Sequence, residues 1–322
     1  MTPQISVLMS VYNGDAFVTE SVASVLAQTF EDFEFIIVDD GSTDKTASIV
    51  ASFSDKRIRL ISQSNTGLTV ALNEALRLCR APFVARQDAD DISYPDRFAT
   101  QLQYFEQHPE VSVVGSWATV IDVEGDAVGL LSNATEPSEI KRKLPSDNTF
   151  IHGSLMFRRH AVESAGGYRP QFRYAQDYDL MLRLSNRYQL ANVPRSLYAI
   201  RHWRGKISID KLPEQLSFRQ LAQTLAAQRR RGEQDALQQN VSIDKLLTPV
   251  EAPSPQHFEH TMLYYCLRSG HLIKARRIIR DLIRAHPGKL KSYVQLALTY
   301  LGHALVEHRI RDLIRAHPGK LK

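Results

Sequence analysis

Residues 33–44 read FEFIIVDDGSTD, an apolar run that ends in carboxylates and turn-forming residues. Three further short apolar runs lie at 5–11, 58–61 and 82–85, and amphipathic segments of helical length separate them. This alternation predicts an α/β fold whose mostly parallel central sheet is flanked by helices. Ligands of such sheets bind beyond the carboxyl ends of the strands, so the residues after each run are the candidates for function.

Polar side chains follow three of the four runs. The first ends in YNGD at 12–15, the second in DDGSTD at 39–44 and the fourth in QDADD at 87–91. Because the carboxyl ends of parallel strands meet at one edge of a sheet, we expect these carboxylates to converge. Pro95 and Asp96 then predict the start of the next helix.

The second half of the chain predicts a more irregular structure. A strand-like stretch occupies residues 111–120, and polar, turn-rich sequence follows it to about residue 148. The segment AQDYDL at 175–180 opens a helix whose first turn carries Asp177 and Asp179. Carboxylates at this position either interact with the helix dipole or serve as a general base.

The charge composition divides the chain into a body, residues 1–256, and a basic tail, residues 257–322. Residues 257–322 carry 13 Lys and Arg against 4 Asp and Glu, whereas the preceding residues carry 27 against 31. This balance argues against nucleic-acid binding by the body. Three prolines between residues 249 and 255 indicate a linker. The predicted organisation is a catalytic domain at 1–215, a helical segment with a Pro-rich linker at 216–256 and a basic helical extension at 257–322.

The basic tail contains two helical patterns, at 257–268 and 272–285. The second is amphipathic and rich in arginine, which fits either peripheral contact with an anionic membrane or the solvated face of a helical hairpin. Residues 279–291 recur without a change at 310–322. Such identity indicates a recent tandem duplication, because repeats kept for packing diverge in sequence.

The 322 residues, 43% of them hydrophobic, suffice for a large core and exclude a disordered or disulfide-stapled chain. The two cysteines, Cys79 and Cys266, lie in apolar helical stretches, which indicates a reducing compartment. The sequence shows no leader-like start and no apolar run of the roughly 20 residues that a spanning helix needs. We therefore expect a cytoplasmic protein, located peripherally on the inner face of the cell membrane if its basic helix binds there.

Asp88 and Asp90 stand two residues apart after a strand, where a loop can direct both carboxylates to one hard cation. Mg²⁺ or Mn²⁺ that is completed by phosphate oxygens fits such a pair, although acidic triplets also occur in ordinary loops. Asp40 can cap a turn or accept a hydrogen bond from a nucleobase. His152 and His202 are ligands, or else core and surface histidines.

Six segments, taken in order, carry a family resemblance: ISVLMSVYNG at 5–14, SVLAQTF at 24–30, VDDGSTD at 38–44, NTGL at 65–68, DADD at 88–91 and QDYDL at 176–180. Together they resemble the family 2 glycosyltransferases with a GT-A fold, of the type that builds bacterial polysaccharides. The resemblance covers about residues 4–210. It implies a Rossmann-like nucleotide-diphospho-sugar transferase domain.

The resemblance implies a donor pocket at the first two strand ends. Val11, Tyr12 and Asn13 are expected to line the nucleotide site, with Tyr12 near the base, and Asp40 to bind uracil or its equivalent.

The resemblance also implies roles around the reacting atoms. Asp88 and Asp90 correspond to the D-x-D pair that contacts ribose and metal, and His202 to a position that approaches the metal or diphosphate. Asp177 falls where the family keeps its catalytic base. His152 lies in a segment that resembles the acceptor side.

Two departures from the family pattern affect these expectations. Gln176 precedes Asp177 where the family usually has Glu, which predicts a change in the acceptor that is taken. Leu72 stands where an Arg is common, so the phosphate contact of that Arg is either missing or supplied by Arg86. The Gln-x-x-Arg-Trp motif of processive members is absent from the sequence, which favours addition of one sugar per encounter.

These roles predict a metal-dependent, inverting glycosyltransferase that uses a UDP-sugar and a glycan or lipid-linked acceptor. In a single displacement, Asp177 takes the acceptor proton while Mn²⁺ or Mg²⁺ offsets the charge on the leaving diphosphate. Two alternatives stay open. A nucleotidyltransferase would need a basic residue in the loop at 12–15, which has none. A nucleotide-sugar-binding scaffold that has lost catalysis is suggested by Gln176.

Overall fold

The computed structural model describes residues 2–251 and 257–288, and these form two compact units. Of the described residues, the first unit comprises 2–119, 131–201 and 211–251, and the second comprises 120–130, 202–210 and 257–288. Helix α9 (Leu212–Arg230) thus spans the expected boundary at residue 215 and packs on α7 (Gln176–Leu184) of the first unit. Part of the linker, Pro253–Pro255, lies outside the described residues.

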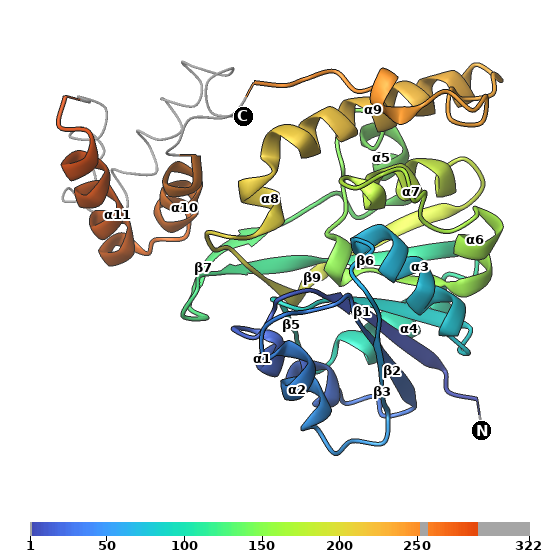
Figure 1. Ribbon diagram of the computed structural model, residues 1–322, viewed down its shortest axis with the longest axis horizontal. Helices are drawn as coiled ribbons and strands as arrows, with labels where there is room; N and C mark the ends of the chain where they lie inside the picture. The colour runs from blue at the N-terminus through green and yellow to red at the C-terminus, as the bar shows by residue number, and fades with distance from the viewer. Residues whose placement is uncertain (1, 252–256, 289–322) are drawn as a thin grey trace. The chain divides into compact units, whose positions relative to one another are not determined.

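Four parallel strands form the first half of the central sheet (Figure 1). They are β1 (Ile5–Val11), β2 (Phe33–Asp39), β3 (Ile58–Ser62) and β4 (Phe83–Asp88), in the order β3-β2-β1-β4. Every residue of β2 is buried, as continuous apolar runs in parallel sheets require. The four strands expected from the sequence are confirmed, and their carboxyl ends share one edge.

The second half of the sheet is mixed. It continues from β4 through β8 (Met156–Arg158), β6 (Val111–Ile121), β9 (Gln189–Arg201) and β5 (Ile92–Ser93). Strand β8 is antiparallel to both β4 and β6, and β5 is antiparallel to β9. The parallel arrangement therefore describes the first four strands only. The stretch that was expected to be only turn-rich also contains β7 (Ala127–Leu131), which pairs with β6, and α5 (Pro137–Lys143).

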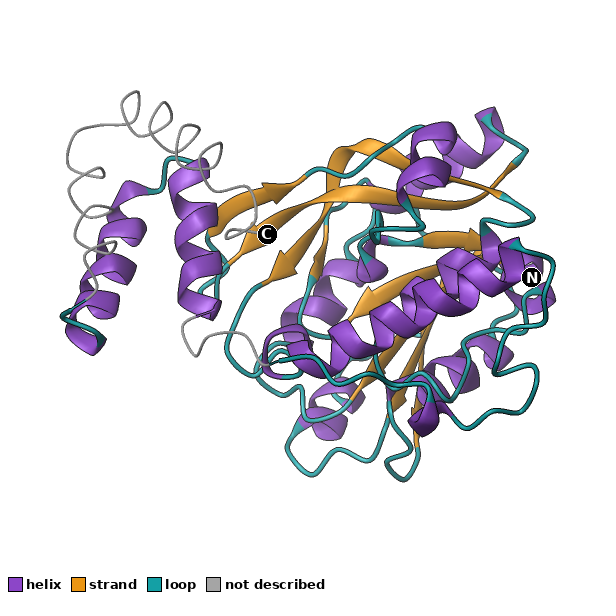
Figure 2. Ribbon diagram, turned by 90° about the horizontal axis from the view of Figure 1, so that it is seen from above, coloured by secondary structure: helices purple, strands orange, loops and turns teal. Residues whose placement is uncertain are grey.

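Helices cover both faces of the sheet (Figure 2). Alternate residues of β1 enter different cores: Val7 and Met9 join one, whereas Leu8 joins the other. The core around Val7 includes residues of α1 (Val18–Leu26), α2 (Thr46–Ala51) and α4 (Arg97–Gln107). The core around Leu8 includes residues of α3 (Leu68–Leu78), α5, α6 (Arg159–Ser164), α7 and α9. The shorter helical elements are η1 (His152–Ser154), α8 (Ile207–Asp210) and η2 (Ile243–Lys245).

The second unit contains the hairpin of α10 (His257–Arg268) and α11 (Leu272–Ala285), with the bounds expected from the sequence. Cys266 of α10 and Ile279 of α11 are fully buried, and the two helices pack together. Lys274 of α11 forms ion pairs with Asp122 and, at 2.8 Å, with Asp126. These pairs tie the hairpin to the turn between β6 and β7. The repeat at 310–322 lies outside the described residues.

Both cysteine thiols are free and buried, and burial raises the pKa of Cys79 to about 12 and that of Cys266 to about 11. They are therefore neutral packing groups. Among the described helices, none is both long enough and apolar enough to cross a bilayer.

Candidate active site

The loops after β1 and β2 are bound to each other. Asn13 adopts a positive φ of 51°, and its side-chain oxygen accepts a hydrogen bond from the Thr43 amide at 2.8 Å. The backbone amide of Asn13 donates to the Ser42 hydroxyl at 3.0 Å. The preceding Val11 is buried, whereas the Tyr12 ring is 51% exposed. An exposed aromatic ring next to fixed polar groups offers a surface on which a base can stack.

Asp40, at the end of β2, is only 2% exposed. Its Oδ1 accepts hydrogen bonds from the Gln63 side chain at 2.7 Å and from the Thr66 amide and hydroxyl at 2.9 and 3.1 Å. Its Oδ2 accepts one bond, from the Gly67 amide at 2.8 Å. Asp40 therefore fixes the loop that leads into α3, and Oδ2 keeps a further lone pair for a ligand.

Asp88 ends β4 and is held by Arg86. The Arg86 side chain is fully buried and forms an ion pair with Asp88 Oδ1, while its Nη1 donates to the carbonyls of Leu8 at 3.0 Å and Gln87 at 2.8 Å. The carboxylate of Asp88 is 30% exposed. With no exposed surface, the Arg86 side chain holds Asp88 in this structure, and the phosphate contact expected of Arg86 stays a prediction.

Arg201, the last residue of β9, fixes the rest of this acidic loop. Its amide donates to Asp91 Oδ1 at 2.8 Å, and its Nε donates to the Asp90 carbonyl at 3.1 Å. Its guanidinium also pairs with Glu20 of α1 at 2.6 Å. The backbone of Asp90 is thereby held, and its side chain stays half-buried at the rim of the site.

His152 and Tyr168 lie next to Arg86. His152 Nε2 is 3.2 Å from Arg86 Nε and 2.9 Å from the Tyr168 hydroxyl. Burial and the nearby Arg86 cation lower the pKa of His152 to about 3, so the imidazole is neutral. Burial raises the pKa of Tyr168, and both Asp177 and Asp88 contribute to that rise. The structure thus brings Asp88 and Asp177 within electrostatic range of the same phenol.

Asp177 occupies the first turn of α7, after Ala175, which adopts the left-handed conformation with φ 52°. The amide of Asn148 donates to Asp177 Oδ2 at 2.9 Å. By contrast, Asp179 is fully buried and pairs with Arg183 at 2.8 Å, so its role is structural. Gln176 is also buried, at 6% exposure. Of the two carboxylates in this turn, Asp177 is the one that a substrate can reach.

His202 belongs to the second unit. Its ring stacks on Phe258 with centroids 5.1 Å apart and meets Tyr265 edge-on. Burial lowers its pKa to about 4, and Nε2 has no hydrogen-bond partner among the described residues. A neutral imidazole with an available nitrogen is the form that binds metals, so the predicted ligand role of His202 stays a prediction.

No group of three His, Cys, Asp or Glu side chains in residues 2–251 and 257–288 is arranged to hold a metal alone. Asp88 and Asp90 nonetheless fit Mg²⁺ or Mn²⁺: both are half-buried oxygen donors, and Asp88 Oδ2 makes no hydrogen bond to the described part of the chain. Magnesium is commonly held by one or two carboxylates and substrate phosphates.

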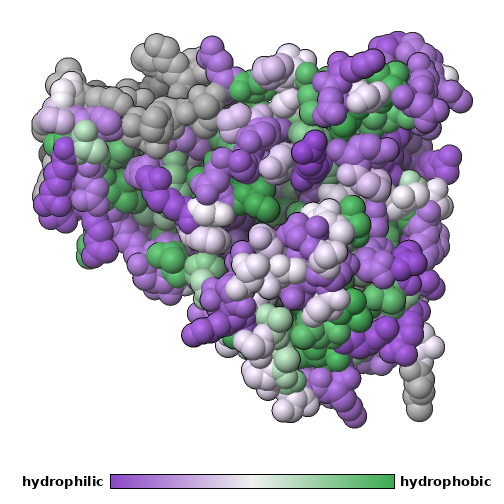
Figure 3. All heavy atoms as spheres, in the orientation of Figure 1, coloured by the Kyte–Doolittle hydropathy of each residue, from purple (hydrophilic) through white to green (hydrophobic). Residues whose placement is uncertain are grey.

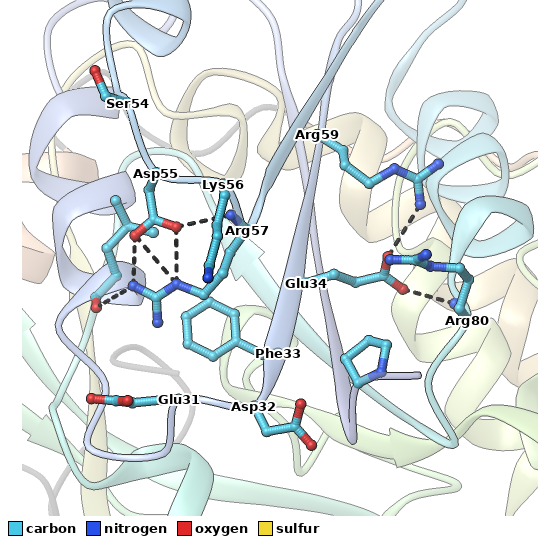
Figure 4. A pocket seen from close by; sticks show the side chains of 12 residues that line it. Glu31, Asp32, Phe33, Glu34, Ser54, Asp55, Lys56, Arg57, Arg59 and Arg80 are labelled. Carbon is cyan, nitrogen blue, oxygen red and sulfur yellow. Dashed lines mark hydrogen bonds and ion pairs between the residues drawn. The ribbon is translucent and has the colours of Figure 1, made fainter. Parts of the chain in front are cut away.

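An open pocket of about 870 Å³ lies at the opposite edge of the sheet, at the amino ends of β1, β2 and β3 (Figure 4). Five of the charged side chains that line it form ion pairs: Arg57 with Asp55 at 2.7 Å, and Arg59 and Arg80 with Glu34 at 3.1 and 2.8 Å. Ligands of parallel sheets bind at the carboxyl ends, so this pocket is not the donor site.

Several site-supporting residues were not found from the sequence: Gln87, Arg97, Asn148, Tyr168 and Arg201. Arg97 had one signal, its place beside Phe98 at the start of an amphipathic helix, where a charged residue faces the core. Asn148, Tyr168 and Arg201 stand at unremarkable positions, because their partners Asp177, His152 and Asp90 are 16 to 111 residues away along the chain.

The fold and this edge of polar loops define an α/β protein of the GT-A class, and the comparisons with known proteins agree. The model of glycosyl transferase family 2 matches residues 6–166. The chain therefore belongs to glycosyl transferase family 2, as its sequence motifs predict.

Two of the curated relatives are named for the biosynthesis of O-antigen and of amylovoran. The chain is 34% identical over 185 residues to the O-antigen biosynthesis glycosyltransferase WbnJ of Escherichia coli, covering 56% of this chain and 72% of WbnJ. It is 34% identical over 202 residues to the amylovoran biosynthesis glycosyltransferase AmsE of Erwinia amylovora, covering 61% of this chain and 75% of AmsE.

Solved structures share the fold at low identity. S. aureus TarS in complex with UDP superposes with a TM-score of 0.56 at 16% identity, over 93% of this chain and 79% of TarS 1–349. The mannosyltransferase PcManGT from Pyrobaculum calidifontis, in complex with GDP-Man and Mn²⁺, gives 0.55 at 16% identity, over 98% and 87%. The GT-A architecture is thus confirmed.

Proposed function

We propose that this glycosyltransferase moves a sugar from a UDP-sugar to a hydroxyl of a glycan or lipid-linked sugar, with a divalent metal and with inversion. One observation carries the proposal: the Asp88 carboxylate, 30% exposed, ends β4 at the edge where the carboxyl ends of the parallel strands β1 and β2 also lie. Nucleotides bind at this edge of parallel sheets, which supports the donor site, and the family resemblance assigns Asp177 to the acceptor side.

In this proposal the nucleotide lies over the loops of β1 and β2. Tyr12 stacks on the base, Val11 and Asn13 line the pocket, and Asp40 accepts a base N–H through Oδ2. The expected base is uracil. The complexes of TarS with UDP and of PcManGT with GDP-Man show that neighbours of this fold bind either nucleotide, so the base is decided by experiment.

Asp88 and Asp90 would hold Mn²⁺ or Mg²⁺, with His202 as a further ligand, and the cation would offset charge on the departing diphosphate. Asp177 accepts the proton of the acceptor hydroxyl as its oxygen attacks the anomeric carbon. The bond from that carbon to the diphosphate oxygen breaks at the same time. Attack on the face opposite the leaving group inverts the anomeric configuration. The family resemblance assigns the segments of His152 and Gln176 to the acceptor side.

The donor site is tested by calorimetric binding of UDP, GDP and their sugar conjugates, with and without Mn²⁺. We expect UDP to bind in the presence of the metal and Asp90→Ala to weaken binding at least about tenfold, because Asp90 would help to hold the cation that offsets the charge of the diphosphate. Asp244→Ala, at a largely exposed carboxylate, is the matched control. Binding of neither nucleotide to the wild type would contradict the proposal.

The role of Asp177 as catalytic base is tested with Asp177→Asn. This substitution keeps the shape of the side chain and its contact with Asn148 but removes the proton acceptor. We expect transfer to fall by about 10²- to 10⁴-fold while the affinity for UDP is kept. The readout is product formation from a UDP-sugar and an acceptor found by screening, with Asp244→Asn as control. Undiminished transfer would remove Asp177 from this role, and wild-type binding without any transfer would favour the scaffold alternative.

We also propose peripheral contact with the anionic inner leaflet of the cell membrane through α11. Its exposed side chains Ile273, Arg277, Arg280 and Arg284 share one helical face. In Figure 3 hydrophilic side chains prevail where α11 forms the surface. Arginines beside an exposed apolar residue suit a surface of anionic lipid headgroups.

A further inference from the structure

One imidazole connects the donor side of the site to the acceptor side. Arg86, which holds Asp88, donates its Nε–H to His152 Nε2 at 3.2 Å, and the Tyr168 hydroxyl lies 2.9 Å from the same nitrogen. Arg86, His152 and Tyr168 come from β4, η1 and the segment before α7. Three distant parts of the chain therefore meet at a single ring nitrogen.

The donors determine the state of this ring. A guanidinium Nε–H can only donate, so His152 Nε2 must be the acceptor, and it carries no proton. The Tyr168 hydroxyl then also donates to Nε2, and the two donors share its single lone pair. The ring proton consequently resides on Nδ1, which takes part in neither of these hydrogen bonds.

The turn that carries His152 also lies close to the Asp88 side chain. A Cβ on Gly153 would lie 2.1 Å from the Tyr198 hydroxyl and 2.8 Å from Asp88 Oδ2, so only glycine fits there. The Tyr198 hydroxyl in turn accepts the Asp88 amide hydrogen at 3.1 Å. The position of η1 and the orientation of Asp88 are thus coupled twice, by the hydrogen bonds of His152 and by the close approach of Gly153.

We propose that His152 is a positioning residue: by accepting hydrogen bonds from both Arg86 and Tyr168 at Nε2, it fixes the orientation in which Asp88 presents its free oxygen to the donor. The inference rests on the proposed donor site and assigns His152 to the support of the D-x-D carboxylate, in place of direct contact with the acceptor. Without this acceptor, the buried Nε–H of Arg86 has no partner, and the guanidinium re-orients together with Asp88.

The experiment compares two substitutions that differ in which ring nitrogen they imitate. His152→Gln places an amide oxygen near the position of Nε2 and can accept both hydrogen bonds, whereas the shorter His152→Asn reaches only the position of Nδ1. Tyr168→Phe removes one donor and leaves the packing in place. His160→Gln is the matched control, because His160 is exposed and only touches Tyr188 edge-on. The probe is UDP with Mn²⁺, followed by calorimetry, and Tm is measured for each variant.

We expect His152→Gln to bind UDP within about threefold of the wild type, and His152→Asn to bind about tenfold or more weakly, as is common when a partner of a metal-binding side chain is lost. Tyr168→Phe should weaken UDP binding several-fold at unchanged Tm. If His152→Asn does not fold, the affinity of Tyr168→Phe tests the positioning role of His152 instead. A purely structural role would lower Tm in both His152 variants and leave the Gln and Asn affinities alike.

Two results would overturn the inference, and they are distinguishable. If the wild type and the control bind UDP with Mn²⁺ but both His152 variants and Tyr168→Phe bind equally well, the positioning role is wrong while the donor site stands. If the wild type binds neither UDP nor GDP, the proposed function fails and the inference fails with it.

Discussion

Arg97 shows how a single buried cation shapes the site. Its guanidinium is fully buried, and its five N–H groups all donate: to Gln101 at 3.1 Å, to Ser93 and Gln87 at 2.8 and 3.4 Å, and to the carbonyls of Arg86 and Leu155 at 2.8 and 3.0 Å. Burial lowers its pKa to about 10, which still leaves the group charged at neutral pH. Arg97 therefore fixes the backbone from which Asp88 projects.

Arg97→Lys tests this role at constant charge. A lysine offers three donors instead of five, so at least two buried acceptors lose their partner. We expect the free energy of unfolding to fall by about 3 kcal/mol, at roughly 1–3 kcal/mol for each unsatisfied group. Urea denaturation measures the change, and Arg77→Lys, at a side chain that is 72% exposed, serves as control. Equal stability of the two variants would mean that the guanidinium geometry is not required.

At the scale of elements, a cluster of buried charges fixes α7, the helix that carries Asp177. Asp179 of α7 pairs with Arg183, and Arg169 lies between Asp179 at 3.7 Å and Asp235 at 2.6 Å. Asp235, which follows α9, also pairs with Arg229 of that helix. Helix α9 and the segment after it thus hold α7 in place through ion pairs. Neither α7 nor α9 could bury these charges without the other.

Asp235→Asn tests the cluster through its pH dependence. Burial by itself would raise the pKa of Asp235, but hydrogen bonds from Arg169, the Gln238 amide and Arg229 outweigh burial and lower the pKa below its usual 3.8. The carboxylate therefore stabilises the fold fully above that value, and the contribution is lost as the pH falls through the lower folded-state pKa.

We expect the Asn variant to lose about 3 kcal/mol of unfolding free energy at neutral pH, because Arg169 and Arg229 lose the carboxylate that they share. The difference from the wild type should shrink as the pH drops below 3.8. Urea unfolding across this range measures both quantities, with Asp244→Asn as control. A difference that does not depend on pH would contradict the account.

At the scale of the whole molecule, positive charge is concentrated in the second unit. The exposed face of α11 presents Arg277, Arg280 and Arg284 beside Ile273, which is 80% exposed. On α10, Arg268 donates to the Tyr264 hydroxyl at 2.6 Å, so an aromatic ring and a cation share its outer surface. A glycosyltransferase that elongates lipid-linked sugars gains local substrate concentration if such a surface rests on the bilayer.

We expect the full chain to co-sediment with vesicles of phosphatidylcholine and phosphatidylserine, and less so as salt increases. Replacing Arg277, Arg280 and Arg284 by Gln should weaken binding about a hundredfold, at about 1 kcal/mol per arginine. The matched control replaces three exposed arginines of the first unit, Arg77, Arg173 and Arg195. Equal sedimentation of both triple variants would show that the face is only solvated.

Local pattern alone predicted much of the architecture. The strand at 5–11 and the helices at 257–268 and 272–285 have the expected bounds, because apolar periodicity and turn residues act over a few neighbours. Helix α5 was missed for the same reason: in PSEIKRK only Ile140 is buried, so the segment has hardly any apolar face to detect. The antiparallel β8 has three residues, too few for a pattern.

The sequence by itself determined the α/β class, the family and the identity of the acidic residues at the strand ends, because these depend on residue type and order. Only the tertiary structure decided what the side chains do to one another. It paired Arg86 with Asp88, separated Asp177 from the ion-paired Asp179, and joined His152 to both Arg86 and Tyr168. Hydrogen bonds of buried polar groups depend on which distant segments meet in the core. The pattern of neighbouring residues in the sequence does not predict which segments these are.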